Sequence, residues 1–454
     1  MRQIIILCSV LFALTIPAFA QYGKKKPKVK LNSSIQKMLK QVSAKQLKKY
    51  NLKLVSFGTR NTNSAQDNPT RGIGAARDWI FDEFKRISAD CGGCLNVAKN
   101  VYAQPKGRRV PKAINLTNIT ATLKGTKNPD RIYVVSGHYD SMCGNPSDGD
   151  CDAPGANDDG SGTVAVIEMA RVMSKQKFDA TIIFMTVAGE EQGLLGSTFA
   201  AKDAVRLKMD IEGMFTNDII GGVKTFKNAP DRQSVRVFAE GVPTNETPRQ
   251  ARLRRSIGGE NDSASRQLGR YIYQVARKYS PKFRVQLIYR RDRFLRGGDQ
   301  TPFLQRGFSA VRFTEPHEDY DHQHQNVGTR NGKFYGDTPE YIDFKYIANV
   351  TKINIAALAS LALAPAKPKK VGIVLRRLTN DTDLKWDANK EDDIAGYEIV
   401  WRRTTAPFWT NSKFVGNVTK YTMEKMSKDN YFFGVRALDK DGNKSPVVFP
   451  RPTR

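Results

Sequence analysis

Short apolar runs separated by helix-like segments dominate the middle of the chain. Residues 132–137 (IYVVSG), 180–189 (ATIIFMTVAG) and 214–221 (MFTNDIIG) are predicted strands, and residues 163–173 (TVAVIEMARVM) are a predicted helix. Apolar strands that alternate with helices are typical of a buried, largely parallel sheet. We therefore expect an α/β fold, with a mixed, largely parallel sheet flanked by helices. A long helix rich in Ala and Leu is expected over residues 340–363.

The pattern changes after a linker rich in Pro and Lys at residues 365–370. Residues 384–386, 397–402 and 431–437 are short alternating segments with turn residues between them. Such segments are typical of a small all-β sandwich. Their spacing resembles a fibronectin type III domain, and the resemblance covers about residues 365–454.

The first twenty residues have the pattern of a secretory signal peptide. A basic start at Arg2 precedes an apolar run over residues 3–15, which is too short to span a bilayer. Residues 17–20 (PAFA) then offer an Ala-x-Ala cleavage site. We expect residues 1–20 to be removed and the protein to be exported, to a periplasm or to the medium. No other stretch approaches 18 consecutive apolar residues, so no transmembrane anchor is expected.

Composition excludes some classes and leaves the charge to be explained. The chain has 454 residues, of which 40% are hydrophobic, and this proportion argues against low-complexity disorder and a multi-span membrane protein. Its 73 Lys and Arg against 45 Asp and Glu give a net charge of +28. Residues 21–50 contribute +10 and residues 248–296 contribute +11, whereas residues 132–170 carry seven acids and no Lys or Arg.

The basic residues do not form a nucleic-acid-binding module with interleaved aromatic residues, so no nucleic-acid partner is expected. The basic tail that begins at residue 21 could bind an anionic surface, and the cationic exterior could favour acidic peptides. The acidic stretch suits divalent cations and a positively charged peptide N-terminus. No pattern indicates an oligomeric state.

Four cysteines remain after the signal peptide: Cys91, Cys94, Cys143 and Cys151. An even number in an exported protein favours disulfides, and four cysteines allow three pairings. We expect the local pairing, Cys91 with Cys94 and Cys143 with Cys151. A redox or zinc site is the alternative for the CysGlyGlyCys segment, although Cys143 and Cys151 have the wrong spacing for a second zinc pair.

Polar side chains follow each of the predicted strands. His138 and Asp140 come after the first strand, Glu190 and Glu191 after the second, and Asp218 ends the third. The carboxyl ends of such strands face the crevice in which α/β proteins bind ligands. Adjacent carboxylates after an apolar strand repel each other, and a divalent cation would remove that cost. An exposed acidic turn is the weaker alternative for the two glutamates.

Two further motifs offer metal ligands. The segment of residues 154–162 (PGANDDGSG) can present Asp158 at the entry to a helix, where a simple helix cap would need only one Asp or Ser. Three of the four histidines, His317, His322 and His324, lie within eight positions of one another. A tract biased in this way is typical of a metal site. Hydrogen-bonded surface histidines are the alternative for any one of them.

These motifs follow one another in an order that resembles the M28 family of zinc metallopeptidases, the co-catalytic di-zinc aminopeptidases. The signatures are GHYDS, PGANDDGSG, AGEEQGLLGS, NDIIG and RGGDQTPF. We therefore divide the chain into a signal peptide (1–20), a basic tail and helical segment joining the catalytic domain (21–114), an M28-like catalytic domain (115–364) and the β-sandwich (365–454).

The resemblance implies two zinc ions and a ligand set. Asp158 would bridge the two ions. His138 and Asp218 would complete one zinc site, and Glu191 and His322 would complete the other. His322 is preferred to His324 because Asn326 lies four residues after His322, at a position where the family usually has an Asp.

The remaining roles also come from the resemblance. Glu190 would be the general base, and Asp140 would orient the imidazole of His138. The bond between Asp158 and Asp159 is a candidate for a cis peptide. Gln300 stands in the RGGDQ motif where many members carry His, and this difference would alter a supporting contact and leave the ligands unchanged.

The expected function is therefore an exported zinc-dependent exopeptidase that acts on peptide substrates, most simply an aminopeptidase. A carboxypeptidase, a dipeptidase or a glutaminyl cyclase on the same scaffold is an alternative, as is a binding or adhesion protein. No expected ligand or base is missing from the sequence, which favours the enzyme.

Overall fold

The computed structural model describes residues 31–225, 229–376 and 379–454. The predicted signal peptide and the first ten residues of the predicted basic tail lie outside the described residues.

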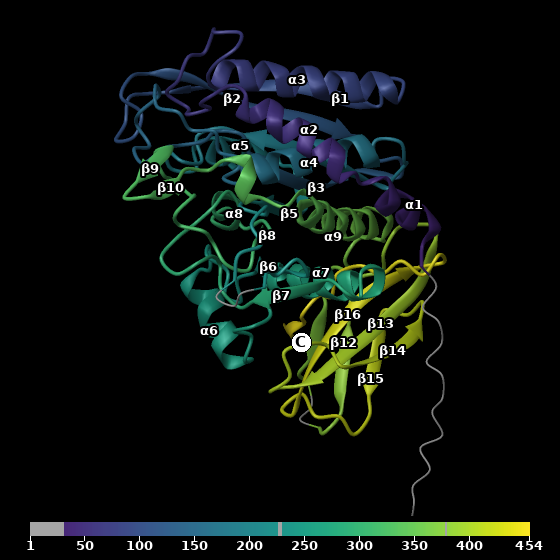
Figure 1. Cartoon of the computed structure of the whole chain (residues 1–454). Coiled ribbons are helices and arrows are strands. Elements are labelled where there is room, and N and C mark those ends of the chain that lie inside the picture. The colour runs from purple at the N-terminus through teal and green to yellow at the C-terminus, as the bar shows by residue number, and fades with distance from the viewer. Residues whose placement is uncertain (1–30, 226–228, 377–378) are drawn as a thin grey trace, which may run out of the picture. The chain divides into compact units, whose positions relative to one another are not determined.

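An eight-stranded mixed sheet forms the centre of the fold, in the order β1-β2-β4-β3-β5-β8-β6-β7 (Figure 1). Its strands are β1 (Leu95–Gln104), β2 (Ile114–Leu123), β3 (Asn128–His138), β4 (Ala180–Val187), β5 (Asp210–Asn217), β6 (Ser234–Phe238), β7 (Arg284–Ile288) and β8 (Ala310–Thr314). The four central strands β4, β3, β5 and β8 are mutually parallel, so their carboxyl ends share one edge.

Helices surround this sheet, and the apolar runs of residues 132–137, 163–173 and 180–189 lie in helices or strands of the core. The helices are α1 (Ser33–Gln41), α2 (Ala44–Val55), α3 (Ile73–Asp90), α4 (Gly160–Met173), α5 (Leu195–Arg206), α6 (Pro248–Ser256), α7 (Ala264–Tyr279), α8 (Gln300–Leu304), a 3₁₀ turn η1 (Pro339–Tyr341) and α9 (Phe344–Leu363). The expected mixed α/β architecture is confirmed.

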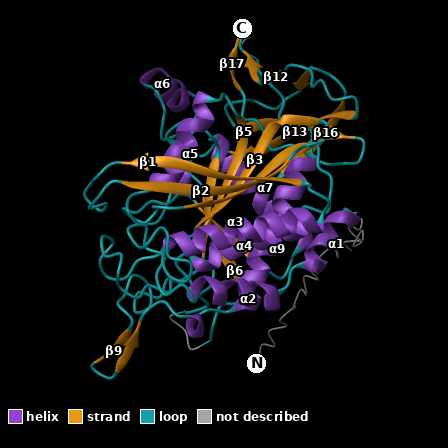
Figure 2. Cartoon of the chain, turned by 90° about the horizontal axis from the view of Figure 1, so that it is seen from above, coloured by secondary structure: helices purple, strands orange, loops and turns teal. Residues whose placement is uncertain are grey.

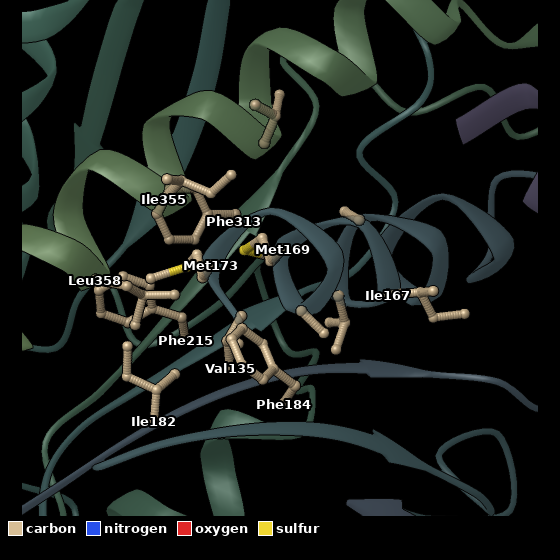
Figure 3. Packing of buried hydrophobic residues seen from close by; sticks show 14 of the residues in the cluster. Val135, Ile167, Met169, Met173, Ile182, Phe184, Phe215, Phe313, Ile355 and Leu358 are labelled. Atoms are coloured by element: carbon tan, nitrogen blue, oxygen red, sulfur yellow. The ribbon is translucent and has the colours of Figure 1, made fainter. Parts of the chain in front are cut away.

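Both faces of the sheet are buried, as the uninterrupted apolar strands require. In β3, Tyr133 and Val135 belong to one apolar cluster, and the alternate residues Ile132 and Val134 belong to another. Helices α4 and α9 pack on β3 and β4 and on each other on the first face (Figure 2). Their side chains interdigitate with those of the strands (Figure 3). Helix α5 contributes to the second cluster.

Helix α9 is the one helix among the described residues that has the length and composition of a membrane span. It is long and apolar enough to cross a membrane, yet 78% of its apolar window is buried inside the fold. Its side chains contact α4, α7 and the sheet, which are the contacts of a core helix.

Two small sheets follow α9. One has the order β15-β12-β11-β17 and the other β14-β13-β16. Their strands are β11 (Gly372–Val374), β12 (Thr382–Lys385), β13 (Ile394–Arg403), β14 (Asn411–Gly416), β15 (Lys420–Met423), β16 (Tyr431–Asp439) and β17 (Arg451–Thr453); a separate hairpin, β9 (Gly328–Arg330) and β10 (Lys333–Tyr335), precedes α9. Both sheets contribute to one apolar cluster around Trp386 and Tyr397. The fibronectin type III assignment of this part stays a prediction.

Both predicted disulfides, Cys91–Cys94 and Cys143–Cys151, are present. The predicted cis peptide between Asp158 and Asp159 is also present.

Candidate metal centre

The candidate residues lie at the shared carboxyl edge of the central strands. His138 is the last residue of β3, and Asp218 directly follows β5. Glu190 and Glu191 come three and four residues after the end of β4, in a turn that leads into α5. Because these strands are adjacent and parallel, side chains that are far apart in the sequence meet at one place.

A tightly held loop presents Asp158 to the same place. The side chain of Asp337 accepts hydrogen bonds from the backbone N–H groups of Asn157 and Asp158, at 2.8 and 2.7 Å. The carboxylate of Asp159 accepts from the N–H of Gly162 and so caps helix α4, and it also accepts from the N–H of His138. The backbone of the loop is therefore fixed from both sides.

The imidazole of His138 and three carboxylates converge at this edge. His138 Nε2 lies 3.1 Å from Asp158 Oδ1 and 3.9 Å from Asp218 Oδ1. The ligand atoms of His138, Asp158 and Glu191 all lie within 4.8 Å of one another, and all three side chains are buried.

A second imidazole, that of His324, completes the cluster. Its Nε2 lies 2.8 Å from Asp158 Oδ2 and 3.0 Å from Glu191 Oε1. The two carboxylate oxygens of Asp158 thus face two different histidines.

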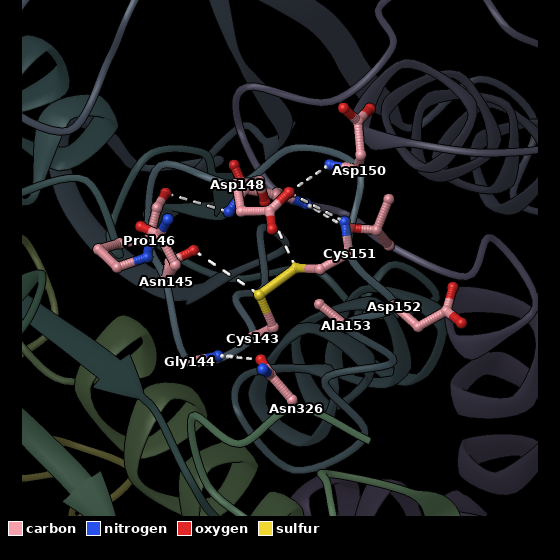
Figure 4. The surroundings of a disulfide bond; sticks show 12 residues. Cys143, Gly144, Asn145, Pro146, Asp148, Asp150, Cys151, Asp152, Ala153 and Asn326 are labelled. Atoms are coloured by element: carbon pink, nitrogen blue, oxygen red, sulfur yellow. Dashed lines mark hydrogen bonds between the residues drawn. A yellow bond between two sulfur atoms is a disulfide. The ribbon is translucent and has the colours of Figure 1, made fainter. Parts of the chain in front are cut away.

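The sequence favoured His322 as the last zinc ligand, but in the structure it is His324 that contacts Asp158 and Glu191. His322 Nδ1 lies 2.9 Å from Asp319 Oδ2, and its ring stacks on Tyr341 with 3.4 Å between the centroids. Asn326, whose spacing supported His322, instead accepts a hydrogen bond from the N–H of Gly144 beside a disulfide (Figure 4). Two histidines separated by one residue project differently from a loop, and sequence spacing could not distinguish them.

Asp140 supports two parts of the cluster at once. Its Oδ1 lies 3.4 Å from His138 Nδ1, and its backbone oxygen lies 3.1 Å from the same nitrogen, so Asp140 is placed where it could orient the ring. Its two oxygens also accept from the N–H groups of Glu190 and Glu191, at 3.3 and 3.2 Å. The carboxylate therefore fixes the turn after β4 as well as the imidazole.

The concentration of acids in a buried place shifts the proton equilibria. Burial raises the pKa of Glu190 well above its usual range, and the charge of Glu191 adds to the effect. Burial disfavours the charged form of His324, yet the carboxylates of Glu191 and Asp158 raise its pKa to about 11. Buried carboxylates that repel one another and attract imidazolium form a site that favours a cation.

Several supporting residues escaped the sequence analysis. Arg312, fully buried in β8, places Nη1 2.8 Å from Asp218 Oδ2 and so holds that carboxylate. Arg60 is also fully buried, and it donates to the backbone oxygens of Tyr139 and Gly155. Buried arginines carry no local sequence signal, because only the folded chain brings their partners together.

The RGGDQ motif lies beside the cluster. Burial raises the pKa of Asp299 to about 7. Gln300 donates to Asp292 Oδ2 at 2.5 Å, and Asp292 lies 3.7 Å from Arg312. Gln300 thus contacts the supporting ion pairs, and the structure shows no contact between it and the candidate ligands.

Imidazole nitrogens and carboxylate oxygens are the donors that zinc takes at catalytic sites, so the residues present fit such an ion. A buried set of these donors at the carboxyl edge of a largely parallel sheet is typical of metal-dependent hydrolases. Residues 118–355, more than half of the chain, match the model of Peptidase family M28, and the chain belongs to this family. It is therefore a hydrolase, and the predicted resemblance is confirmed.

Relatives agree with this assignment, and solved structures share the fold. The chain is 46% identical to a probable zinc metalloprotease of Leptosphaeria maculans, over 92% of this chain and 97% of the relative. It is 47% identical to a probable zinc metalloprotease of Pyricularia oryzae, over 88% and 81%. LapB of Legionella pneumophila has a similar fold, with a TM-score of 0.53 at 18% identity over 74% of this chain and 77% of LapB. The LapA aminopeptidase of the same organism gives 0.51 at 17% identity, over 74% and 76%.

Proposed function

We propose that the protein is a zinc-dependent aminopeptidase that removes N-terminal residues from peptides. The observation that carries this proposal is the convergence of two imidazoles on the two oxygens of Asp158. Membership of Peptidase family M28 and the description of its relatives as probable zinc metalloproteases support it.

We propose a ligand set for two zinc ions, with Asp158 between them. His138 and Asp218 belong to one ion, because both approach the Oδ1 side of Asp158. Glu191 and His324 belong to the other, because His324 contacts both Glu191 and Asp158 Oδ2. His324 therefore replaces His322 in the proposed set.

The remaining residues have roles that follow from their positions. Bound zinc would polarise the scissile carbonyl and lower the pKa of a coordinated water. Glu190 would take a proton from the attacking water and return it to the leaving amine. Asp140 would keep His138 and the turn of Glu190 in place, and Arg312 would hold Asp218.

The same centre also suits the amino end of a peptide, because a bound zinc could take the free α-amine in its neutral form. We also propose that the protein is exported, which the two disulfides support because disulfides persist in oxidising compartments.

Paired substrates test the proposal. The zinc-loaded protein should hydrolyse unblocked aminoacyl amides and should not hydrolyse the same compounds after N-acetylation. Glu190→Gln should lower kcat by about 10²-fold or more while zinc content stays unchanged. Asp152→Asn, at an exposed position directly after the disulfide Cys143–Cys151, is the matched control and should retain activity. Activity on N-acetylated substrates with a free C-terminus would instead identify a carboxypeptidase and refute the proposal.

A further inference from the structure

A cavity of about 210 Å³ adjoins the candidate metal centre on the side of Asp158. Segments after β5, after β8 and before α9 line it, and His322 is on its wall. The residues that matter for its chemistry are Lys224, Glu315, Asp319, Gln323 and Tyr341.

Two buried acceptors on the cavity wall have no hydrogen-bond partner. Glu315 is fully buried; one carboxylate oxygen accepts from Asn157 Nδ2 and from the N–H of Gly222, and Oε1 accepts from no described group. Gln323 donates its amide to Asp158 Oδ2, which leaves its own Oε1 without a partner. No unpartnered buried donor is found among the described residues that line the cavity. An occupant that donates hydrogen bonds would satisfy both acceptors.

Charge on the wall also favours a cation. Lys224 pairs with Asp319 at 2.7 Å and with Asp321 at 3.5 Å, so its charge is balanced. Glu315, Asp337 and Asp158 line the cavity as well, and none of them forms an ion pair with Lys224 among the described contacts. Burial raises the pKa of Glu315 to about 8, and a bound cation would favour the charged form of this carboxyl. Tyr341 and His322 also lie on the wall, with their rings stacked on each other.

We propose that this cavity receives the side chain of the substrate's N-terminal residue and selects lysine or arginine. The inference rests on the proposed function, because Asp158 joins the cavity to the centre at which the terminal amine would lie. A long side chain that starts at this centre would carry its cationic end to Glu315 and Gln323. His322 then serves as a wall of the substrate pocket, stacked behind Tyr341.

Other N-terminal residues would pair less well with the two acceptors on the cavity wall, Glu315 Oε1 and Gln323 Oε1. Leucine would leave both acceptors buried and unpaired, and a site built to bond a polar group discriminates strongly against analogues that lack it. Glutamine would donate two hydrogen bonds and supply no charge. Glutamate would bring an anion next to Glu315.

A panel of unblocked aminoacyl amides measures the selection. With the zinc-loaded full chain, kcat/KM for lysine and arginine should exceed that for leucine by about tenfold or more, and glutamate should be the poorest substrate. Glu315→Gln keeps the shape of the side chain and should lower the ratio of kcat/KM for lysine to that for leucine by about tenfold. Glu260→Gln, the same replacement at an exposed partner of Arg254 that is not part of the cavity wall, should leave the ratio unchanged. A preference of the wild type for leucine or glutamine over lysine would overturn the inference.

Two further measurements test the pocket even if the Glu315 variant does not fold. They also distinguish the pocket proposal from the aminopeptidase proposal. Asp319→Asn removes the nearer of the two carboxylates that pair with Lys224, leaves Asp321 at 3.5 Å, and should also lower the ratio of lysine to leucine. In calorimetry, zinc-loaded Glu190→Gln should bind lysine amide about tenfold more tightly than leucine amide. Tighter binding of lysine amide without hydrolysis of any unblocked substrate by the wild type would refute the peptidase proposal and keep the pocket. Equal binding, together with normal hydrolysis of leucine amide, would refute the pocket and keep the peptidase.

Discussion

Single buried carboxylates hold the candidate centre together, and Asp140 is the clearest example. It contacts the imidazole of His138 and two backbone N–H groups of the turn after β4. A carboxylate behind a ligand imidazole fixes the ring and raises its basicity. One side chain therefore affects both a candidate ligand and the position of the candidate base.

We predict that Asp140→Asn lowers zinc affinity by about 10- to 100-fold, since the amide offers one acceptor where the carboxylate offered two. Competition with a chromophoric chelator measures the affinity. Asp152→Asn is the control for a change of charge nearby and should leave the affinity unchanged. Equal zinc affinity of Asp140→Asn and the wild type would show that Asp140 does not support the ligands.

Glu315 should leave a signature in the pH dependence of stability. Burial raises its pKa from 4.5 to about 8, so between these values the folded chain binds more protons than the unfolded chain. The free energy of unfolding should then fall as pH rises through this range, by at most about 1.4 kcal/mol per pH unit. Glu315→Gln lacks this contribution, so its stability relative to the wild type should increase with pH. Urea unfolding at several pH values measures the difference, and parallel curves would contradict the prediction.

The residues that sequence reasoning found and missed differ in a physical way. His138, Asp158, Glu191 and Asp218 lie at strand or helix ends, where the order of apolar and polar positions marks them. Arg312 has no such mark, because its role depends on a partner that folding brings from another strand.

At the scale of elements, the loop that carries His324 is held by a neighbouring loop. The disulfide Cys143–Cys151 closes residues 143–151, and the N–H of Gly144 donates to Asn326 Oδ1 at 2.9 Å (Figure 4). The carbonyl oxygen of Pro146 in the same loop accepts from Gln192, next to Glu191. The disulfide loop therefore contacts both segments that supply the proposed second ion with ligands.

We predict that replacing Cys143 and Cys151 together by Ser lowers zinc affinity by about tenfold, because the loops that hold His324 and Glu191 lose a common support. The double replacement of Cys91 and Cys94 by Ser is the matched control. That disulfide joins the end of α3 to the start of β1, away from the candidate ligands, and its loss should leave zinc affinity unchanged. Equal effects of the two double variants would indicate general destabilisation and would count against the coupling.

Local pattern predicted the strands and helices of the catalytic part well, but it did not show how the N-terminal segment contributes. Arg60 lies between α2 and α3, in the segment described as a tail and helical region, and it contacts the loop that presents Asp158. Residues of α1, α2 and α3 belong to the same apolar cluster as the sheet. Their long sequence separation from the strands hides this packing from any local pattern.

At the scale of the whole described chain, the C-terminal sheets are joined to the peptidase fold by buried charges. Asp262, just before α7, lies 2.7 Å from Arg270 and 2.6 Å from Arg402 of β13, and all three side chains are almost fully buried. Trp409 donates to Gln267 across the same interface. Removing the central carboxylate of this triad would leave two buried cations without an anionic partner, so the triad should couple the two parts strongly.

We predict that the wild type unfolds in one calorimetric transition and that Asp262→Ala lowers the free energy of unfolding by about 3–5 kcal/mol, since Arg270 and Arg402 would then repel each other in a buried place. The variant should show two transitions, because the sandwich has its own apolar cluster and can unfold separately once the interface is weakened. Glu260→Ala is the control and should keep one transition. Glu260 lies two residues before Asp262, and its side chain is an exposed partner of Arg254. Two transitions in the wild type would show that the two parts are not coupled, and the role assigned to the buried triad would then be wrong.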